Sequence, residues 1–318
     1  MIIEHASTDL VPKPWGTHDL RPWAETGDEV GRVGEIWFRR RDPASPEPAL
    51  LLKVLFTTER LSVQVHPDDD YARRIGLPNG KTEAWYVLAS EPGGEVALGL
   101  KQSLTAAELR LAIVDGSLAE MIAWRDVHSG DAISVPAGTI HAIGAGLVVA
   151  EIQQRSDATF RMFDYGRGRT LQIDDALAVA DGGPAAEAPA AYPLDEIRTV
   201  LVVSPYFVFE LIQLPPETYW NIEAGLETWI LVLDGHGRVG SLHAFAGRAF
   251  FLEGGEAPIE SGHVGVRALV AYGSAVPRVD LLSISAARTR PVHRWRRRGP
   301  GWPRHRHHLT FGNRAVPI

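Results

Sequence analysis

Two histidines, a glutamate and a glutamine stand in short segments whose patterns would let them act together. Polar and apolar residues alternate in Leu61–His66, so Gln64 and His66 project from the same face of an extended strand. After a glycine turn, Lys81 and Glu83 share a face of a second strand in the same way. The first segment alone is equally compatible with an ordinary half-buried strand whose polar face meets solvent.

A third segment, Gly130–His141, reads as a strand, a tight Pro-Ala-Gly turn and a histidine on the strand that follows. Two imidazoles, a carboxylate and an amide oxygen form a ligand set suited to Zn²⁺, and also to Fe²⁺ or Mn²⁺. A single histidine is more often a hydrogen-bonded core residue than a ligand. Compatible groups from three separate segments favour one shared metal site.

The composition excludes several kinds of chemistry and several classes of partner. There is no cysteine among the 318 residues, which excludes disulfides, thiolate nucleophiles and thiolate metal sites. No uninterrupted apolar stretch is long enough to cross a bilayer, so we expect neither membrane insertion nor secretion, and a cytoplasmic location. The net charge is −7. Because the last 31 residues hold many arginines and no acidic residue, the rest of the chain is strongly acidic, which disfavours non-specific nucleic-acid binding.

Short apolar runs separated by Gly and Pro predict a mainly β fold. The exception is residues 105–124, where Thr105 and Glu108 form a capping-box pattern and two short helices are expected, divided near Asp115. A further helix is expected over residues 171–180. The expected strands cover residues 49–56, 61–66, 84–88, 132–135, 147–152, 199–203, 207–214, 228–233 and 268–272.

Residues 182–193 are rich in Gly, Ala and Pro and have the composition of a linker. We therefore predict a first domain over residues 1–181, which carries the metal site, and a second over 194–286. The basic segment 287–318 loses the strand pattern and is expected to be a poorly ordered, solvated tail.

The motifs resemble those of a known family. The spacing of Gly130, Pro136, Gly138 and His141 matches the second cupin motif, and Gln64-Val-His66 followed by Glu83 resembles the first motif as found in type I mannose-6-phosphate isomerases. Similar segments in that family include Gly80-Lys-Thr-Glu-Ala-Trp85 and Glu151-Ile-Gln-Gln-Arg-Ser-Asp157. The resemblance implies two cupin-like β-barrel or jelly-roll domains, the first with a small helical insertion and the second degenerate and non-catalytic.

The resemblance also implies roles for individual residues. It places one Zn²⁺ per chain on Gln64, His66, Glu83 and His141, and it makes Lys81, Asp157 and Arg161 face the substrate. Glu151 or Asp157 is the expected general base, with a metal-bound water as the alternative. Structural alternatives are that Arg161 pairs with Asp157 or Asp164, that Lys81 is a solvated turn residue, and that Glu151 only orients a ligand.

The implied reaction interconverts mannose 6-phosphate and fructose 6-phosphate through a cis-enediol, with a sugar phosphate as the small-molecule partner and a monomer or homodimer as the active form. One alternative is a cupin oxygenase or epimerase using the same metal cage. The other is a non-catalytic sugar-binding cupin. The cations Lys81 and Arg161 favour a phosphorylated substrate over the first, and the full set of ligands argues against the second.

Overall fold

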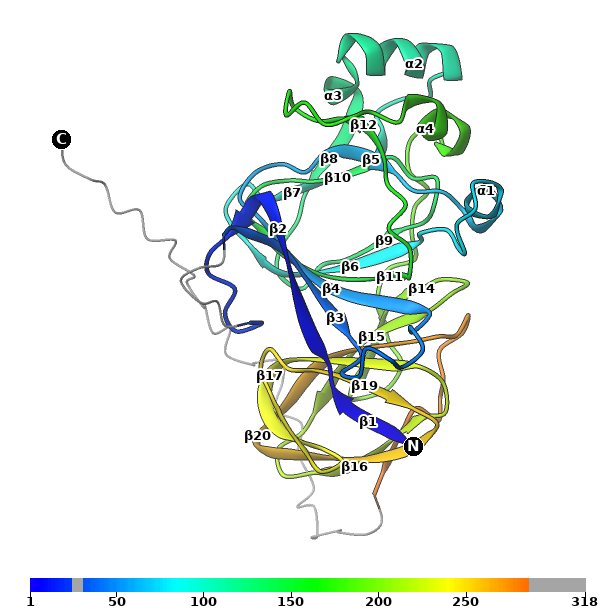
Figure 1. The fold of residues 1–318 in the computed structure, drawn as a ribbon. Coiled ribbons are helices and arrows are strands. Elements are labelled where there is room, and N and C mark those ends of the chain that lie inside the picture. Colours follow the sequence, from blue (N-terminus) through cyan, green and yellow to red (C-terminus); the bar gives the residue numbers. More distant parts are fainter. Residues whose placement is uncertain (25–30, 286–318) are drawn as a thin grey trace, which may run out of the picture. The chain divides into compact units, whose positions relative to one another are not determined.

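The computed structural model describes residues 1–24 and 31–285, which belong to one compact unit, and these residues form three antiparallel sheets and four short helices (Figure 1). Among the described residues, no helix has the length and apolar character needed to cross a membrane. The predicted mainly β fold is confirmed. The predicted tail, 287–318, lies outside the described residues.

A six-stranded sheet forms the middle layer. In spatial order its strands are β2 (Ser7–Thr17), β3 (Val33–Arg39), β4 (Leu50–Thr57), β11 (Leu147–Gln154), β6 (Glu83–Ser90) and β9 (Ala132–Val135). Every residue of β4 is buried, as its continuous apolar run predicts for a strand covered on both faces. Lys53 is the one charged residue in that run, so its ammonium must find partners inside the protein.

A five-stranded sheet faces one side of this layer. It contains β12 (Phe160–Phe163), β5 (Val63–Val65), β10 (His141–Ile143), β7 (Glu95–Leu100) and β8 (Ile122–Asp126). Trp85, Val149 and Ile143 belong to the apolar cluster shared by the two sheets. The opposite side of the five-stranded sheet packs against α2 (Ala106–Asp115) and α4 (Ile173–Val179) through Val63, Val65 and their neighbours.

The helical insertion follows the sequence prediction except at its end. Thr105 and Glu108 make both bonds of the capping box, and Gly116 ends α2 in the left-handed conformation. A second short helix, α3 (Leu118–Met121), follows. The helix expected to reach residue 124 stops at residue 121 because Ile122 and Trp124 pair with β7 instead.

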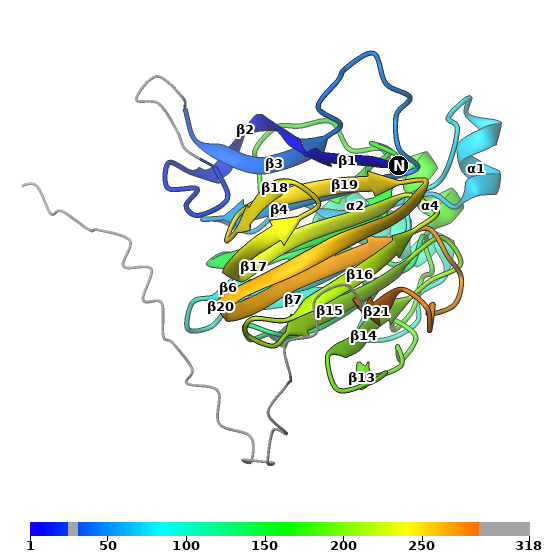
Figure 2. The same cartoon turned by 90° about the horizontal axis from the view of Figure 1, so that it is seen from below.

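The remaining strands form a ten-stranded sheet that Figure 2 shows from below. Its strands are β1 (Ile2–His5), β13 (Tyr192–Pro193), β14 (Arg198–Val203), β15 (Val208–Leu214), β16 (Tyr219–Ala224), β17 (Thr228–Val239), β18 (Leu242–Phe245), β19 (Ala249–Glu253), β20 (Gly255–Tyr272) and β21 (Leu282–Ile284). One face, including Phe209 and Trp229, packs on the six-stranded sheet, and the other, including Val208 and Ile230, lines a separate core.

The predicted boundary at residues 182–193 stays a prediction. Residues 182 and 183 accept backbone hydrogen bonds from Leu104 and Leu100 of the first half, and Tyr192 pairs with Val200 of the second half. The N-terminal strand β1 pairs with β19, so the first residues of the chain belong to the ten-stranded sheet.

Candidate metal centre

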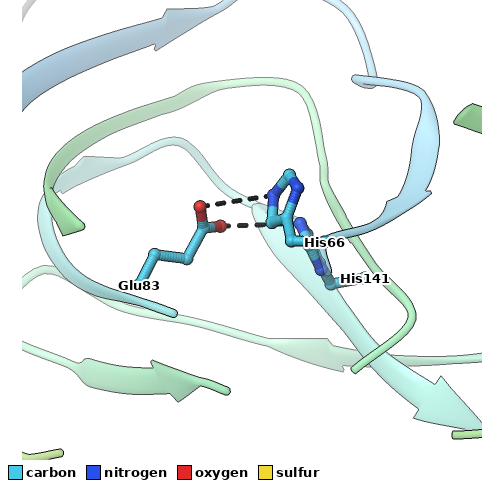
Figure 3. Close-up of side chains that lie close together, drawn as sticks. All are labelled: His66, Glu83 and His141. Carbon is cyan, nitrogen blue, oxygen red and sulfur yellow. Dashed lines mark ion pairs between the residues drawn. The ribbon is translucent and has the colours of Figure 1, made fainter. Parts of the chain in front are cut away.

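Three predicted ligands meet in the interior between the five- and six-stranded sheets (Figure 3). His66 follows β5, His141 begins β10 in the same sheet, and Glu83 begins β6 in the facing sheet. The first ligand segment and the last are tied together because Gln64 and His141 are direct partners in the β5–β10 ladder. The turn before His141 uses Gly138 at φ +89°, a conformation that L side chains rarely adopt.

The ligand atoms are close and almost fully buried. His66 Nε2 lies 3.3 Å from one Glu83 carboxylate oxygen, and His141 Nε2 lies 3.5 Å from the other. Each of the three side chains is 1% exposed. They are the one His/Cys/Asp/Glu group within residues 1–24 and 31–285 whose geometry suits a metal ion.

Backbone carbonyls fix which imidazole nitrogen faces the carboxylate. His66 Nδ1 lies 2.8 Å from the carbonyl oxygen of Ala158, and His141 Nδ1 lies 2.8 Å from that of Thr139. Because a carbonyl only accepts, each Nδ1 carries the proton and each Nε2 presents a lone pair. This is the usual arrangement around histidines that bind a metal.

The donor set fits a divalent cation. Two lone pairs and a carboxylate at these distances attract a positive charge, and the Lys81 ammonium supplies one at His66 and Glu83. Ligands of one tetrahedral ion stand about 3.4 Å apart, and one ligand atom from each of the three residues lies within 4.8 Å of the others, close enough to share an ion. Glu83 Oε2 is buried and faces both His66 Nε2 and the Lys81 ammonium, so a bound cation would share this oxygen with Lys81.

Gln64 lies beside the cluster. Its Nε2 is 3.2 Å from His141 Nε2, and its Oε1 is 3.4 Å from Ser62 Oγ. A half-turn of the amide would exchange nitrogen and oxygen and present Oε1 to the cluster, as the predicted ligand role requires. The geometry therefore brings Gln64 to the centre with its amide nitrogen, not its oxygen, on the side of His141.

Lys81 is a buried part of this centre and not a solvated turn residue. Its Nζ lies 3.0 Å from both His66 Nε2 and Glu83 Oε2, and its side chain is 6% exposed. Burial disfavours the ammonium, but the carboxylates of Glu83 and Glu151 outweigh it and hold the pKa of Lys81 above its ordinary value.

The electrostatics keep Glu83 ionised and the histidines neutral. Burial disfavours the Glu83 carboxylate, but the ammonium of Lys81 holds its pKa well below the usual range. Burial, followed by the charge of Lys81, lowers the pKa of His66 to about 3, and burial also lowers the pKa of His141. Neutral imidazoles beside an ionised carboxylate are the forms that bind a metal.

Glu151 is connected to the centre through Trp85. The indole Nε1 donates to Glu151 Oε2 at 3.0 Å, and the indole ring packs edge-on against His141 with 5.6 Å between ring centroids. Lys53 Nζ lies 3.3 Å from Glu151 Oε1. Burial, and then repulsion by Glu83, raises the pKa of Glu151.

Trp85 and Lys53 were not predicted as site residues. Trp85 shares the strand face of Glu83, two residues away, and Lys53 interrupts the apolar run of β4. These two patterns were the available signals, but neither tells which residue across the sheet each side chain contacts.

Arg161 lies next to this group, whereas Asp157 does not join it. Arg161 is paired with Gln64 in the β12–β5 ladder, its Nη1 donates to the carbonyl of Thr170 at 3.0 Å, and its buried Nε has no partner among the described residues. The expected alternative pairing with Asp164 is not seen, because that carboxylate pairs with Arg167 and Arg169 instead.

Asp157 is exposed in the connection between β11 and β12, and no hydrogen bond or ion pair joins it to the other candidates in the described ranges.

Comparisons with known proteins find curated relatives for part of the chain. The chain is 41% identical over 166 residues to mannose-6-phosphate isomerase of Streptococcus mutans, covering 50% of this chain and 52% of the relative. It is 42% identical over 139 residues to mannose-6-phosphate isomerase ManA of Bacillus subtilis, covering 42% and 44%. The chain thus matches about half the length of these curated relatives, and no protein-family model matches it.

Solved structures extend the likeness to the whole fold. The crystal structure of mannose 6-phosphate isomerase from Bacillus subtilis aligns with a TM-score of 0.71 at 24% identity, over 84% of this chain and 98% of that one. A phosphomannose isomerase mutant from Salmonella typhimurium aligns with a TM-score of 0.69 at 14% identity, over 86% and 99%. At these identities the structures establish a shared fold and no more.

Proposed function

We propose that this chain is a metal-dependent aldose–ketose isomerase that interconverts mannose 6-phosphate and fructose 6-phosphate through a cis-enediol. The observation that carries the proposal is the buried convergence of His66, Glu83 and His141 beside the ammonium of Lys81. The relatives that match the chain at about 41% identity are named for this activity, which supports the choice of substrate.

In this proposal one Zn²⁺ is held by His66, Glu83, His141 and the amide oxygen of Gln64. Imidazole and carboxylate donors in one buried cluster favour Zn²⁺, although the same donors accept Fe²⁺ or Mn²⁺. When bound, the ion supplies a Lewis acid that favours negative charge on a sugar oxygen. The cupin assignment, the cytoplasmic location and the monomer or homodimer remain predictions of the sequence.

The chain's own residues would bind the anionic substrate and move its proton. The unpaired Nε–H of Arg161 supports a role in holding a phosphate or enediolate oxygen, because a guanidinium N–H without a partner is unfavourable when buried. Lys81 would place a compact positive charge beside the developing enediolate.

Glu151 is the better candidate for the general base of the two that the sequence left open. Its pKa is raised, chiefly by burial, which brings it closer to the pH at which a carboxylate both accepts and returns a proton. Asp157 is exposed. The ion pair with Lys53 and the hydrogen bond from Trp85 would hold the Glu151 carboxylate in place.

The test combines activity with metal content. Replacing His141 by Ala removes one ligand, so we expect isomerisation of mannose 6-phosphate and retention of Zn²⁺ after dialysis to be lost together. His128→Ala is the matched control, because His128 is exposed and should leave both unchanged. In the unaltered protein a chelator should abolish turnover and added Zn²⁺ should restore it. Turnover or bound metal in His141→Ala equal to that of the control would contradict the assignment.

A further inference from the structure

The segment that carries Lys81 and Glu83 is not held by a sheet where it enters the site. Residues 80–82 precede β6, so their three N–H groups must find other acceptors. Gly80 N donates to Asp69 Oδ1 at 2.8 Å, Lys81 N to the carbonyl of Pro67 at 2.9 Å, and Thr82 N to Gln154 Oε1 at 2.9 Å. Two of the three acceptors are therefore side chains from elsewhere in the fold.

Asp69 controls both of these side-chain contacts. The oxygen that accepts from Gly80 also accepts from Gln154 Nε2 at 2.9 Å, which fixes the Gln154 amide so that its oxygen faces Thr82. Gln154 ends β11, and its own N donates to the carbonyl of Thr82 at 3.1 Å. A single carboxylate oxygen thus holds residue 80 directly and residue 82 through Gln154, on either side of Lys81.

Close packing leaves the segment little freedom. A Cβ built on Gly80 would lie 2.5 Å from the carbonyl oxygen of Pro67 and 2.5 Å from the carbonyl carbon of Asp68, so residue 80 presses against the backbone that follows His66. Thr82 Oγ1 accepts from Ala137 N at 3.2 Å, in the turn that leads to His141. The contacts of residues 80–82 therefore reach all three segments that supply the ligands.

The contacts of Asp69 also extend to the half of the chain that forms the ten-stranded sheet. Tyr206, in the connection between β14 and β15, hydrogen-bonds Asp69. Burial disfavours the Asp69 carboxylate, but the bonds from Gly80, Gln154 and Tyr206 outweigh it and hold the pKa of Asp69 below its ordinary value. Asp69 is thus ionised at neutral pH and accepts bonds from both halves of the described chain.

We propose that Asp69 is a positioning residue: its carboxylate, with Gln154 as relay, sets where Lys81 and Glu83 stand relative to His66 and His141. The inference rests on the proposed metal site and isomerase function. Asp69 touches neither the ligand atoms nor Lys81 Nζ, so it acts only through the backbone of residues 80–82.

The test compares Asp69→Ala with Asp69→Asn and with Asp70→Ala. Loss of a residue that orients metal ligands costs about 10- to 100-fold in metal affinity or activity. We expect Asp69→Ala to lose that much in kcat and in Zn²⁺ affinity measured by chelator competition, with KM changing less. Asp69→Asn keeps an oxygen at the same place and should recover to within about 3-fold of the unaltered protein. Asp70, on the same helix, has a side chain that is 83% exposed and should be replaceable without effect.

Gln154→Leu provides a second variant, because it removes the relay and leaves the Asp69 carboxylate present. It should cause part of the losses of Asp69→Ala, because the bond from Gly80 N to Asp69 is kept, and the double variant should add little to Asp69→Ala alone. Asp69→Ala matching Asp70→Ala in both readouts, or Asp69→Asn failing like Asp69→Ala, would overturn the proposal. The Zn²⁺ competition is independent of turnover, so it still tests Asp69 if the unaltered protein binds zinc but does not isomerise mannose 6-phosphate.

Discussion

Replacement of Lys81 by Met should destabilise the protein strongly without metal and weakly with it. Lys81 Nζ lies 3.0 Å from Glu83 Oε2, and the two side chains are 6% and 1% exposed. The substitution keeps the side chain out to the ε position but removes the ammonium, which leaves the Glu83 carboxylate buried without its lysine. A bound dication would neutralise the same carboxylate, so Lys81 and the metal are partly redundant.

The magnitude follows from the burial of the pair. Removing one partner of a buried ion pair costs about 3–5 kcal/mol, and the lower value is expected here because His66 and His141 are close enough to take up a proton. With Zn²⁺ bound, the cost should fall to about 1 kcal/mol, as for an ordinary substitution. The difference of about 2 kcal/mol means that Lys81→Met should bind Zn²⁺ about 30-fold more tightly than the unaltered protein while losing activity.

The assay is urea unfolding at pH 8 of chelator-treated and Zn²⁺-loaded protein, together with chelator competition for the affinity. Lys53→Met is the matched control, because Lys53 is 5% exposed and pairs at 3.3 Å with Glu151, which is not a predicted ligand. We expect its cost to be nearly the same with and without metal. Equal destabilisation of Lys81→Met in both states, or weaker Zn²⁺ binding, would refute the view that lysine and metal share the charge of Glu83.

Two further predictions concern the arginine and the histidines. Arg161→Lys should reduce kcat about 100-fold, the scale for loss of one positioned donor, while bound zinc and the melting temperature stay unchanged; metal loss would instead indicate a structural role. In metal-free protein, His66 and His141 are neutral with lowered pKa values, so the unfolded chain takes up protons first as the pH falls below about 6.5. The free energy of unfolding, measured in urea, should therefore fall below pH 6.5, with a slope that approaches about 1.4 kcal/mol per pH unit for His66 near pH 5 and a further contribution from His141. His66→Gln should reduce that slope, and an unchanged slope would contradict it.

The local patterns of the sequence were sufficient for much of the fold. Alternation placed Gln64 on the polar face of β5, and Thr105 with Glu108 predicted the start of α2. These features depend on interactions within a few residues, namely strand periodicity and capping, so they are present in the sequence itself. The predicted end of the helical insertion was wrong. The strand conformation of Ile122 depends on its pairing with β7, which lies more than twenty residues earlier in the chain.

For the site, too, some features follow from the sequence and others only from the tertiary structure. The sequence determined the types of the candidate ligands, their order along the chain and their faces on the strands, and in the structure His66, Glu83 and His141 lie together. Only the tertiary structure decided that Asp157 lies exposed while Glu151 is buried, since both are acidic residues close to the same strand end. Burial and the distances between charges depend on which sheets face each other, and periodicity along one strand carries no information about the facing sheet.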